Sequence, residues 1–293
     1  MYAFTFHRPQ TVRQAAGLLT KNGDAKLLAG GQTLLPTMKL RLAGPPQIID
    51  MTLIEGMSGI EQSGRTLTIG AMTTHNEVNT SPVVQQAAPV LAHLAGLIGD
   101  PAVRHRGTIG GSIANNDPNA DYPAACLGLG ATIVTNKRRV KADDFFTGMF
   151  STVLEPAEII TKVIFPLPKK AAYQKFRNQA SRFALVGVFV SKRGSEIRVA
   201  VTGAGSNGVF RVKSFEEALK KRFSPKSLDG LTIPADGMNS DIHGSAEYRA
   251  HLVSVLARRA VADANSDASL LQKVADTVTS VLPGTGAVGK PAE

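Results

Sequence analysis

The sequence contains no tryptophan, one cysteine and few aromatic residues, which make up 5% of its 293 residues. A single cysteine excludes a disulfide framework, a cysteine-ligated zinc site and an iron–sulfur cluster held by this chain alone. Cys126 lies in an apolar stretch, where a small buried side chain is expected rather than a nucleophile. No apolar run is long enough to span a membrane, and the N-terminus lacks the pattern of a signal peptide. We therefore expect a cytoplasmic protein.

Hydrophobic residues make up 43% of the chain, which is enough to form a core. Segments with helical spacing and segments with strand-like alternation both occur, and this predicts an α+β fold. The net charge is +10, but the basic residues are scattered apart from small clusters such as Lys137-Arg138-Arg139. Because nucleic-acid binding requires a denser basic stripe, we expect a solvated face, part of which can complement an acidic partner subunit.

The pattern divides the chain into three parts. Residues 1–55 are predicted to form a small βαβ-like lobe, and residues 56–170 a second lobe of hairpins and helices. The hydrophobic pattern of the sequence changes near residues 168–174, around the end of Pro166-Leu167-Pro168. Residues 171–282 are predicted to form a C-terminal domain, and residues 283–293 a disordered tail.

Within these parts, short strands alternate with amphipathic helices. A helix capped by Thr11 is predicted up to Lys21, and a hairpin with Gly64 in its turn is predicted at residues 60–73. Apolar residues at helical spacing predict one helix from Val83 to Ile98. The other main elements expected are buried strands at 25–28 and 47–51, strands at 158–165, 183–191 and 197–203, and helices at 34–42, 214–221 and 247–264.

Two glycine-centred segments each leave an apolar run. The first, residues 27–36, contains Gly30-Gly31, and the second, residues 106–118, contains Gly110-Gly111. A glycine pair lets main-chain N–H groups approach an anion closely, although a tight turn after a strand explains either segment alone. The segments are rich in donors and small residues and lie in separate predicted lobes. Together they predict two loops that hold the diphosphate of a dinucleotide from both sides of a cleft.

A Gly-x-Gly-x-x-Gly pattern is also present, at residues 203–208, after a predicted strand. A Rossmann site requires a helix to begin at the third glycine, so that its positive end meets the diphosphate. Here Val209-Phe210-Arg211-Val212 is strand-like, and helical character begins only at Ser214. We therefore interpret this segment as a glycine-rich connection between strands.

The remaining polar residues indicate neither a metal site nor a nucleophile. No Ser/His/Asp or Cys/His set is evident, so we assign no catalytic residue and no metal ligand. His105 lies close to the second glycine segment. The histidines that show no metal-ligand spacing and are expected on the surface or in the core are His75, His93, His105, His243 and His251.

Around the glycine segments the sequence resembles a known family. Residues 29–42, 98–101, 107–111, 117–118 and 121–123 are similar to the FAD-binding medium subunit of molybdenum hydroxylases. This family includes the carbon monoxide dehydrogenase medium subunit and the flavin domain of xanthine dehydrogenase. The similarity covers nearly the whole chain and is weaker at the C-terminal helix. It implies a two-lobed PCMH-type FAD-binding domain followed by a C-terminal α/β domain.

The resemblance also implies which residues bind FAD. Asp121 stands where the family places a carboxylate near the ribityl or ribose hydroxyl groups of FAD, whereas the residues alone suggest a turn or cap before Pro123. Phe183 stands where some members place an aromatic ring over the isoalloxazine, whereas the residues alone suggest core. The expected cofactor-binding residues are Ala29, Gly30, Gly31, Gln32, Thr33, Leu34, Thr108, Ile109, Gly110, Gly111, Ser112, Asn115, Asp121 and Phe183.

Gln32 bears on how FAD is held. Relatives carry His or Gln at this position, and flavin-linking histidines occur in the wider superfamily. Because glutamine cannot form that bond, the resemblance implies that FAD is bound non-covalently.

The implied function is electron transfer within a complex. A large molybdenum-cofactor subunit would oxidise carbon monoxide, a purine, an aldehyde or an N-heterocycle. A small iron–sulfur subunit would carry the electrons to FAD in this chain, and NAD, a quinone or oxygen would accept them. A dimer of heterotrimers is expected. Two alternatives stay open: a self-contained flavin oxidase acting on a small substrate, and an assembly module that has lost FAD.

Overall fold

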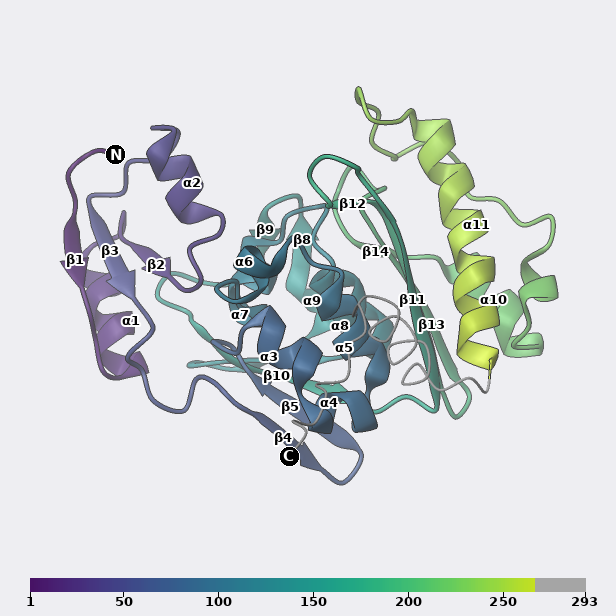
Figure 1. The fold of residues 1–293 in the computed structure, drawn as a ribbon, viewed down its shortest axis with the longest axis horizontal. Coiled ribbons are helices and arrows are strands. Elements are labelled where there is room, and N and C mark those ends of the chain that lie inside the picture. The colour runs from purple at the N-terminus through teal and green to yellow at the C-terminus, as the bar shows by residue number, and fades with distance from the viewer. Residues whose placement is uncertain (267–293) are drawn as a thin grey trace, which may run out of the picture.

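The computed structural model describes residues 1–266. Its three larger sheets define three units, which follow one another across the molecule from the N-terminal unit to the C-terminal one (Figure 1). The predicted tail at 283–293, and the last part of the predicted domain at 171–282, lie outside the described residues.

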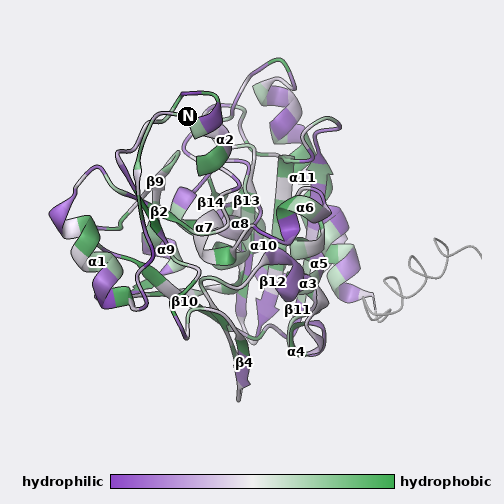
Figure 2. Ribbon diagram, turned by 60° about the vertical axis from the view of Figure 1, so that its left-hand side comes forward, coloured by the Kyte–Doolittle hydropathy of each residue, from purple (hydrophilic) through white to green (hydrophobic). Residues whose placement is uncertain are grey.

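The N-terminal unit is a parallel sheet with strand order β1-β3-β2. Thr11 caps the first helix as predicted, because its side chain accepts a hydrogen bond of 3.1 Å from the N–H of Gln14. Figure 2 shows that this helix carries both hydrophobic and hydrophilic residues, and only Ala15 on it is fully buried. The elements are β1 (Thr5–His7), α1 (Val12–Lys21), β2 (Lys26–Leu28), α2 (Leu34–Lys39) and β3 (Gln47–Asp50).

The middle unit is an antiparallel sheet with strand order β4-β5-β10-β6-β7, covered by short helices. The predicted hairpin at 60–73 is confirmed, with Gly64 in its turn at φ 54°. The elements are β4 (Ile60–Ser63), β5 (Thr66–Gly70), α3 (His75–Thr80), α4 (Pro82–Ala87), α5 (Pro89–Gly96), α6 (Pro101–Arg104), α7 (Ile109–Asn115), α8 (Tyr122–Leu129), β6 (Thr132–Thr135), β7 (Arg139–Lys141), α9 (Ala142–Phe145), β8 (Phe146–Gly148), β9 (Ser151–Thr152) and β10 (Ile160–Pro166).

The single helix predicted from Val83 to Ile98 is wrong, because two helices occupy this region. Helix α4 ends at Ala87 and α5 begins at Pro89. Proline has no N–H for the preceding turn and forces the residue before it out of helical geometry. Ala88 accordingly has φ −147° and ψ 67°.

The C-terminal unit is an antiparallel sheet with strand order β11-β12-β13-β14. One hydrophobic core packs this sheet against α10 and α11. Helix α8, which belongs to the middle unit, contacts strands β12 and β13 of the C-terminal sheet. All residues of α8 are buried, and a Cβ on Gly128 would lie 2.4 Å from the Phe189 ring. The elements are β11 (Lys170–Arg177), β12 (Ala184–Arg193), β13 (Glu196–Thr202), β14 (Phe210–Arg211), α10 (Lys213–Lys221), the 3-10 helix η1 (Pro225–Leu228) and α11 (Ala246–Asn265).

Candidate functional site

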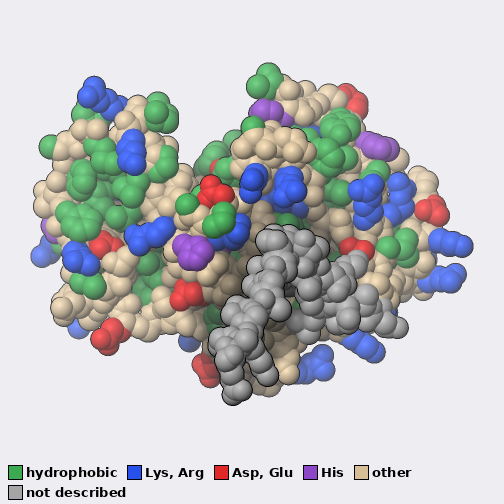
Figure 3. Space-filling model, viewed as in Figure 1, with side chains coloured by type: hydrophobic (Ala, Val, Ile, Leu, Met, Phe, Trp, Pro, Cys, Tyr) green, Lys and Arg blue, Asp and Glu red, His purple; other side chains and the backbone are tan. Residues whose placement is uncertain are grey.

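A cavity of about 660 Å³ is lined by residues of all three units. Figure 3 shows the surface hollowed between the N-terminal unit and the rest of the molecule. Its volume falls within the range of small-molecule and cofactor sites. Every residue predicted to bind the cofactor lines this cavity except Ile109, which is fully buried in the core and donates its N–H to the carbonyl of Thr73.

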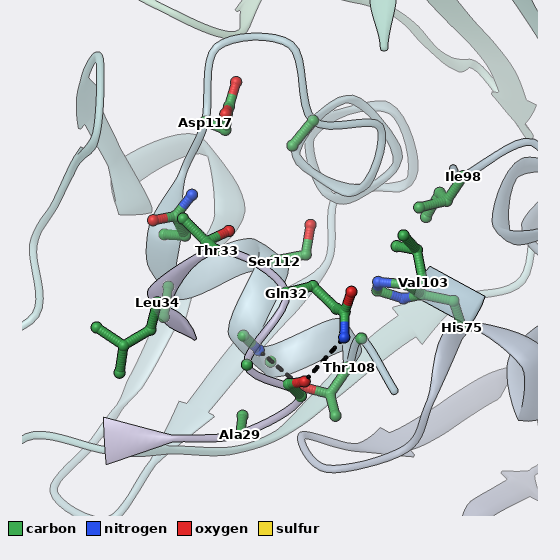
Figure 4. A pocket seen from close by; sticks show the side chains of 18 of the residues that line it. Ala29, Gln32, Thr33, Leu34, His75, Ile98, Val103, Thr108, Ser112 and Asp117 are labelled. Carbon is green, nitrogen blue, oxygen red and sulfur yellow. Dashed lines mark hydrogen bonds between the residues drawn. The ribbon is translucent and has the colours of Figure 1, made fainter. Parts of the chain in front are cut away.

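The first glycine segment presents unpaired main-chain donors. The N–H groups of Gly30, Gly31, Gln32 and Thr33 donate to no acceptor within residues 1–266. Gly31 has φ 71°, which favours glycine, and the side chain of Gln32 turns back to the carbonyl of Gly30 at 3.3 Å (Figure 4). Successive N–H groups in such a bend form a concave anion site. Strand β2 before it is only half buried, contrary to the buried strand predicted, because its residues line the cavity.

The second glycine segment is not the loop that the sequence predicts. Gly110 and Gly111 lie in the first turn of α7, whose cap is Thr108. The N–H of Gly111 is bonded to the Thr108 side chain at 3.1 Å, and the N–H of Gly110 to the carbonyl of Ala71 at 2.8 Å. The glycine pair therefore serves helix capping and close packing, and the second segment contributes the positive end of a helix rather than a second nest.

The two segments contact each other directly. A Cβ on Gly30 would lie 2.1 Å from the carbonyl oxygen of Arg106 and 2.6 Å from Cα of Gly107. A Cβ on Gly111 would lie 3.5 Å from the side chain of Ala29. The expectation that these distant segments converge on one cavity is therefore confirmed, although only the first offers unpaired glycine N–H groups.

Several polar side chains near the contact between the two glycine segments have unused hydrogen-bonding groups. The side chains of Thr33, Ser112 and Asn115 line the cavity and make no hydrogen bond within the described chain. Asp117 also lines it; its Oδ1 accepts the N–H of Asn119 at 2.8 Å, and burial raises the pKa of its carboxyl group. These groups can bind hydroxyl, amide or phosphoryl groups of a ligand.

Asp121 stands at the N-cap position of α8, but its side chain makes no capping bond. Its two oxygens accept hydrogen bonds from the Tyr173 hydroxyl at 2.6 Å and from Lys175 Nζ at 2.9 Å. Burial raises the pKa of Asp121, and the Lys175 ammonium opposes that shift. Asp121 thus lines the cavity as one half of a buried ion pair that joins the middle unit to β11.

The residues alone suggest that Phe183 belongs to the core, but the structure places it elsewhere. Its side chain is 48% exposed and lines the cavity at the start of β12. The hairpin loop before it is closed by the N–H of Asn178, which donates to the carbonyl of Phe183 at 2.8 Å. A half-exposed aromatic ring at a cavity wall provides a flat surface for a ring system.

Lys175 and His75 are among the cavity residues that sequence reasoning missed. Lys175 lies on β11, a strand that the pattern does not reveal, since its charged side chain is buried against the Asp121 carboxylate and the carbonyl of Leu97. The sequence predicts His75 on the surface or in the core, but it lines the cavity beside the second segment (Figure 4). His105, which lies closer in sequence, is exposed and does not line it.

The remaining interpretations of the sequence concern residues that lie outside the cavity. Residues 203–208 connect β13 to β14, which confirms the glycine-rich connection between strands. Cys126 is fully buried, and burial raises the pKa of its thiol far above the ordinary value. Within residues 1–266, no cluster of metal-ligating side chains is found, and no helix is long and apolar enough to cross a membrane.

Unpaired main-chain donors, a helix N-terminus, a half-exposed aromatic ring and apolar walls together define a protein that binds a nucleotide-type cofactor. Two family models match the chain. The FAD binding domain in molybdopterin dehydrogenase matches residues 2–168, and the CO dehydrogenase flavoprotein C-terminal domain matches residues 171–264. The chain therefore belongs to the family of FAD-binding medium subunits of molybdenum hydroxylases, and it is a component of an oxidoreductase.

Individual relatives agree. The carbon monoxide dehydrogenase medium chain of Hydrogenophaga pseudoflava is 37% identical over 274 residues, covering 88% of this chain and 96% of the relative. The nicotine 6-hydroxylase medium subunit of Paenarthrobacter nicotinovorans is 35% identical over 278 residues, covering 90% and 98%. The solved carbon monoxide dehydrogenase from Hydrogenophaga pseudoflava, a form that lacks the Mo-pyranopterin moiety, aligns with a TM-score of 0.81 at 36% identity, covering 90% of this chain and 97% of that chain.

The residues present fit FAD. The Gly30–Thr33 segment supplies donors that only an external acceptor can satisfy, and a diphosphate is such an acceptor. A side chain at Gly30 would collide with Arg106 and Gly107, where the two glycine segments meet beside these donors. The cavity walls combine this polar centre with apolar residues such as Met51, Met57 and Ile160, which suit planar rings.

Proposed function

We propose that this chain is the electron-transfer flavoprotein subunit of a molybdenum hydroxylase complex. Its FAD would receive electrons from iron–sulfur clusters and pass them to NAD, a quinone or oxygen. The observation that carries the proposal is the set of unpaired N–H groups from Gly30 to Thr33, packed against Arg106 and Gly107 in a cavity shared by all three units.

The proposed site residues act by binding and orientation. The Gly30–Thr33 donors would hold the diphosphate, while Ser112, Asn115 and Asp121 would meet the hydroxyl groups of the linker. Phe183 would lie against the isoalloxazine. The remaining proposed contacts are Ala29, Leu34 and the α7 residues that line the cavity. With Gln32 in place of a linking histidine, the cofactor is held non-covalently.

The bound flavin supplies the redox chemistry, since it can take up single electrons and deliver a pair. The chain's residues provide the surrounding charge. The unpaired N–H groups of Gly30 to Thr33 favour negative charge on a bound cofactor, whereas the charge of Lys175 on the cavity wall is balanced by its ion pair with Asp121.

The proposed partners are a small iron–sulfur subunit and a large molybdenum-cofactor subunit, assembled as a dimer of heterotrimers. Relatives bear names that refer to medium chains of carbon monoxide dehydrogenases and to a subunit of the 6-hydroxypseudooxynicotine dehydrogenase complex. The basic surface of this chain suits acidic partner subunits.

The test is purification of the chain with its native partners from its host. Flavin, molybdenum and iron are then measured, and the partner chains are identified. We expect one FAD per chain together with iron- and molybdenum-containing subunits, and reduction of the flavin by substrate only in the complete complex. A colourless chain, or a chain that turns over a substrate alone, would contradict the proposal.

A further inference from the structure

His75 is held rigidly at the seam between the two glycine segments. It is the first residue of α3, which begins with a capping box between Thr74 and Glu77. Its main-chain N–H donates to the carbonyl of Gly107 at 2.9 Å, and a Cβ on Gly107 would lie 2.6 Å from Nε2 of its ring. Gly30 packs against the same Gly107, so a single glycine separates the imidazole from the unpaired donors of the first segment.

The imidazole has no hydrogen-bond partner in the described chain. The residue is only 5% exposed, and Nδ1 is sealed from solvent without a partner. Nε2 also has no hydrogen-bond partner within residues 1–266, but it is not sealed in the same way. Since His75 lines the cavity, Nε2 is the ring nitrogen that a molecule in the cavity can reach and pair.

The surroundings of the ring keep it neutral. Arg104 on α6 faces it with a positive charge, and the Tyr122 ring on α8 lies against it with centroids 5.4 Å apart. Burial, followed by the charge of Arg104, lowers the pKa of His75 to about 4. A neutral imidazole carries one N–H donor, and the cation beside it favours an anion rather than a carbonyl as the acceptor.

We propose that His75 is a diphosphate ligand of the cofactor, donating its Nε2–H to a phosphoryl oxygen beside the Gly30–Thr33 donors. This inference rests on the proposed function, because it assumes that FAD occupies the cavity. It adds a side-chain donor from α3 to the main-chain donors of the first segment. Negative phosphoryl oxygens close to the ring would also favour its protonation, so binding would raise the pKa of His75.

The test uses the full chain freed of flavin, titrated with FAD, ADP and riboflavin. ADP carries the diphosphate without the flavin, and riboflavin carries the flavin without phosphate. We expect His75→Leu to weaken FAD and ADP binding by roughly 10- to 100-fold, as for loss of a hydrogen bond to a charged group, and to leave riboflavin binding unchanged. His75→Gln, which restores a donor, should recover most of the loss. His105→Leu, on the exposed neighbouring turn, is the matched control and should bind all three like wild type.

Ring nitrogen NMR of the wild-type chain gives a second readout that does not depend on any variant folding. The His75 ring should titrate near pH 4 when free and at a higher pH with ADP bound. Unchanged FAD affinity in a folded His75→Leu chain, an equal loss for riboflavin, or a titration that ADP does not move would each overturn the inference. Failure of the wild-type chain to bind FAD would instead overturn the proposed function itself.

Discussion

Gly30 is the position at which the smallest change should abolish cofactor binding. A methyl group there would lie 2.1 Å from the carbonyl oxygen of Arg106, where ordinary contact begins at 3.4 Å, so it is too close by about 1.3 Å. The nearest obstructing atoms belong to the main chain of Arg106 and Gly107, and no rotamer change can move them. Gly30→Ala must therefore push the two glycine segments apart.

The energetic effect on binding should exceed the effect on folding. Overpacking of this kind costs about 1–3 kcal/mol of folding free energy. Donors displaced by about 1 Å lose their hydrogen-bond geometry, and each bond to a charged acceptor contributes about 1.5–3 kcal/mol. Loss of two such bonds from the Gly30–Thr33 set should weaken FAD binding by at least about 100-fold.

The assay is titration of the flavin-free chain with FAD, followed by flavin fluorescence, at a temperature well below the melting point of each variant. Gly17→Ala is the control in the same unit, since its Cβ meets nothing within 4 Å and it lies inside helix α1. It should gain about 0.5–1 kcal/mol of stability and leave FAD affinity unchanged. Binding of FAD by Gly30→Ala within about threefold of wild type would refute the reasoning.

Three further predictions concern stability. Gly110→Ala should lower the free energy of unfolding by about 1–3 kcal/mol, because its Cβ would lie 2.6 Å from Cβ of Ala71. Gly111→Ala should melt near wild type in a thermal scan, because its Cβ would meet the Thr108 hydroxyl at 3.0 Å and Ala29 at an ordinary 3.5 Å. Lys175→Met should cost about 3–5 kcal/mol in urea denaturation by leaving buried Asp121 unpaired, and adding Asp121→Asn should recover part of that loss; equal stability of the single and double variants would contradict a paired role. Burial opposes ionisation of Glu158, but bonds from Arg138, the Glu155 N–H and Thr135 lower its pKa from 4.5 to about 2. Glu158 therefore stabilises the fold above pH 4.5 and loses this effect as the pH falls toward 2, so the deficit of Glu158→Gln should be largest at neutral pH and vanish in acid; a deficit that does not change with pH would contradict this.

Elements with local signals could be predicted from the sequence. The cap at Thr11 and the turn at Gly64 mark positions where the chain must change direction, and the structure has them there. The break at Ala88 was also local, because Pro89 forces it, but the apolar spacing on both sides concealed it. Strand β11 carried no such signal, since its burial depends on pairing along β12 and on the ion pair of Lys175 with Asp121.

Part of the cavity wall could be predicted from the sequence, but its bonding could not. All the residues identified from resemblance and glycine content line the cavity except Ile109, which is buried in the core. Lys175 and His75 were missed because their positions depend on contacts with Asp121 and Gly107, which lie far away along the chain. No pattern within a single segment reports such contacts.

The two glycine pairs show why composition alone misassigns donors. A glycine is favoured where the backbone adopts a positive φ, as at Gly31, and equally where another part of the protein approaches closely, as at Gly110. Both uses produce the same letters in the sequence. What separates them is the partner of the N–H group: the Gly31 N–H has none in the described chain, while the Gly110 N–H is bonded to Ala71. An anion site therefore requires both the missing Cβ and the unpaired donor, and in this cavity that combination occurs in the first glycine pair and not in the second.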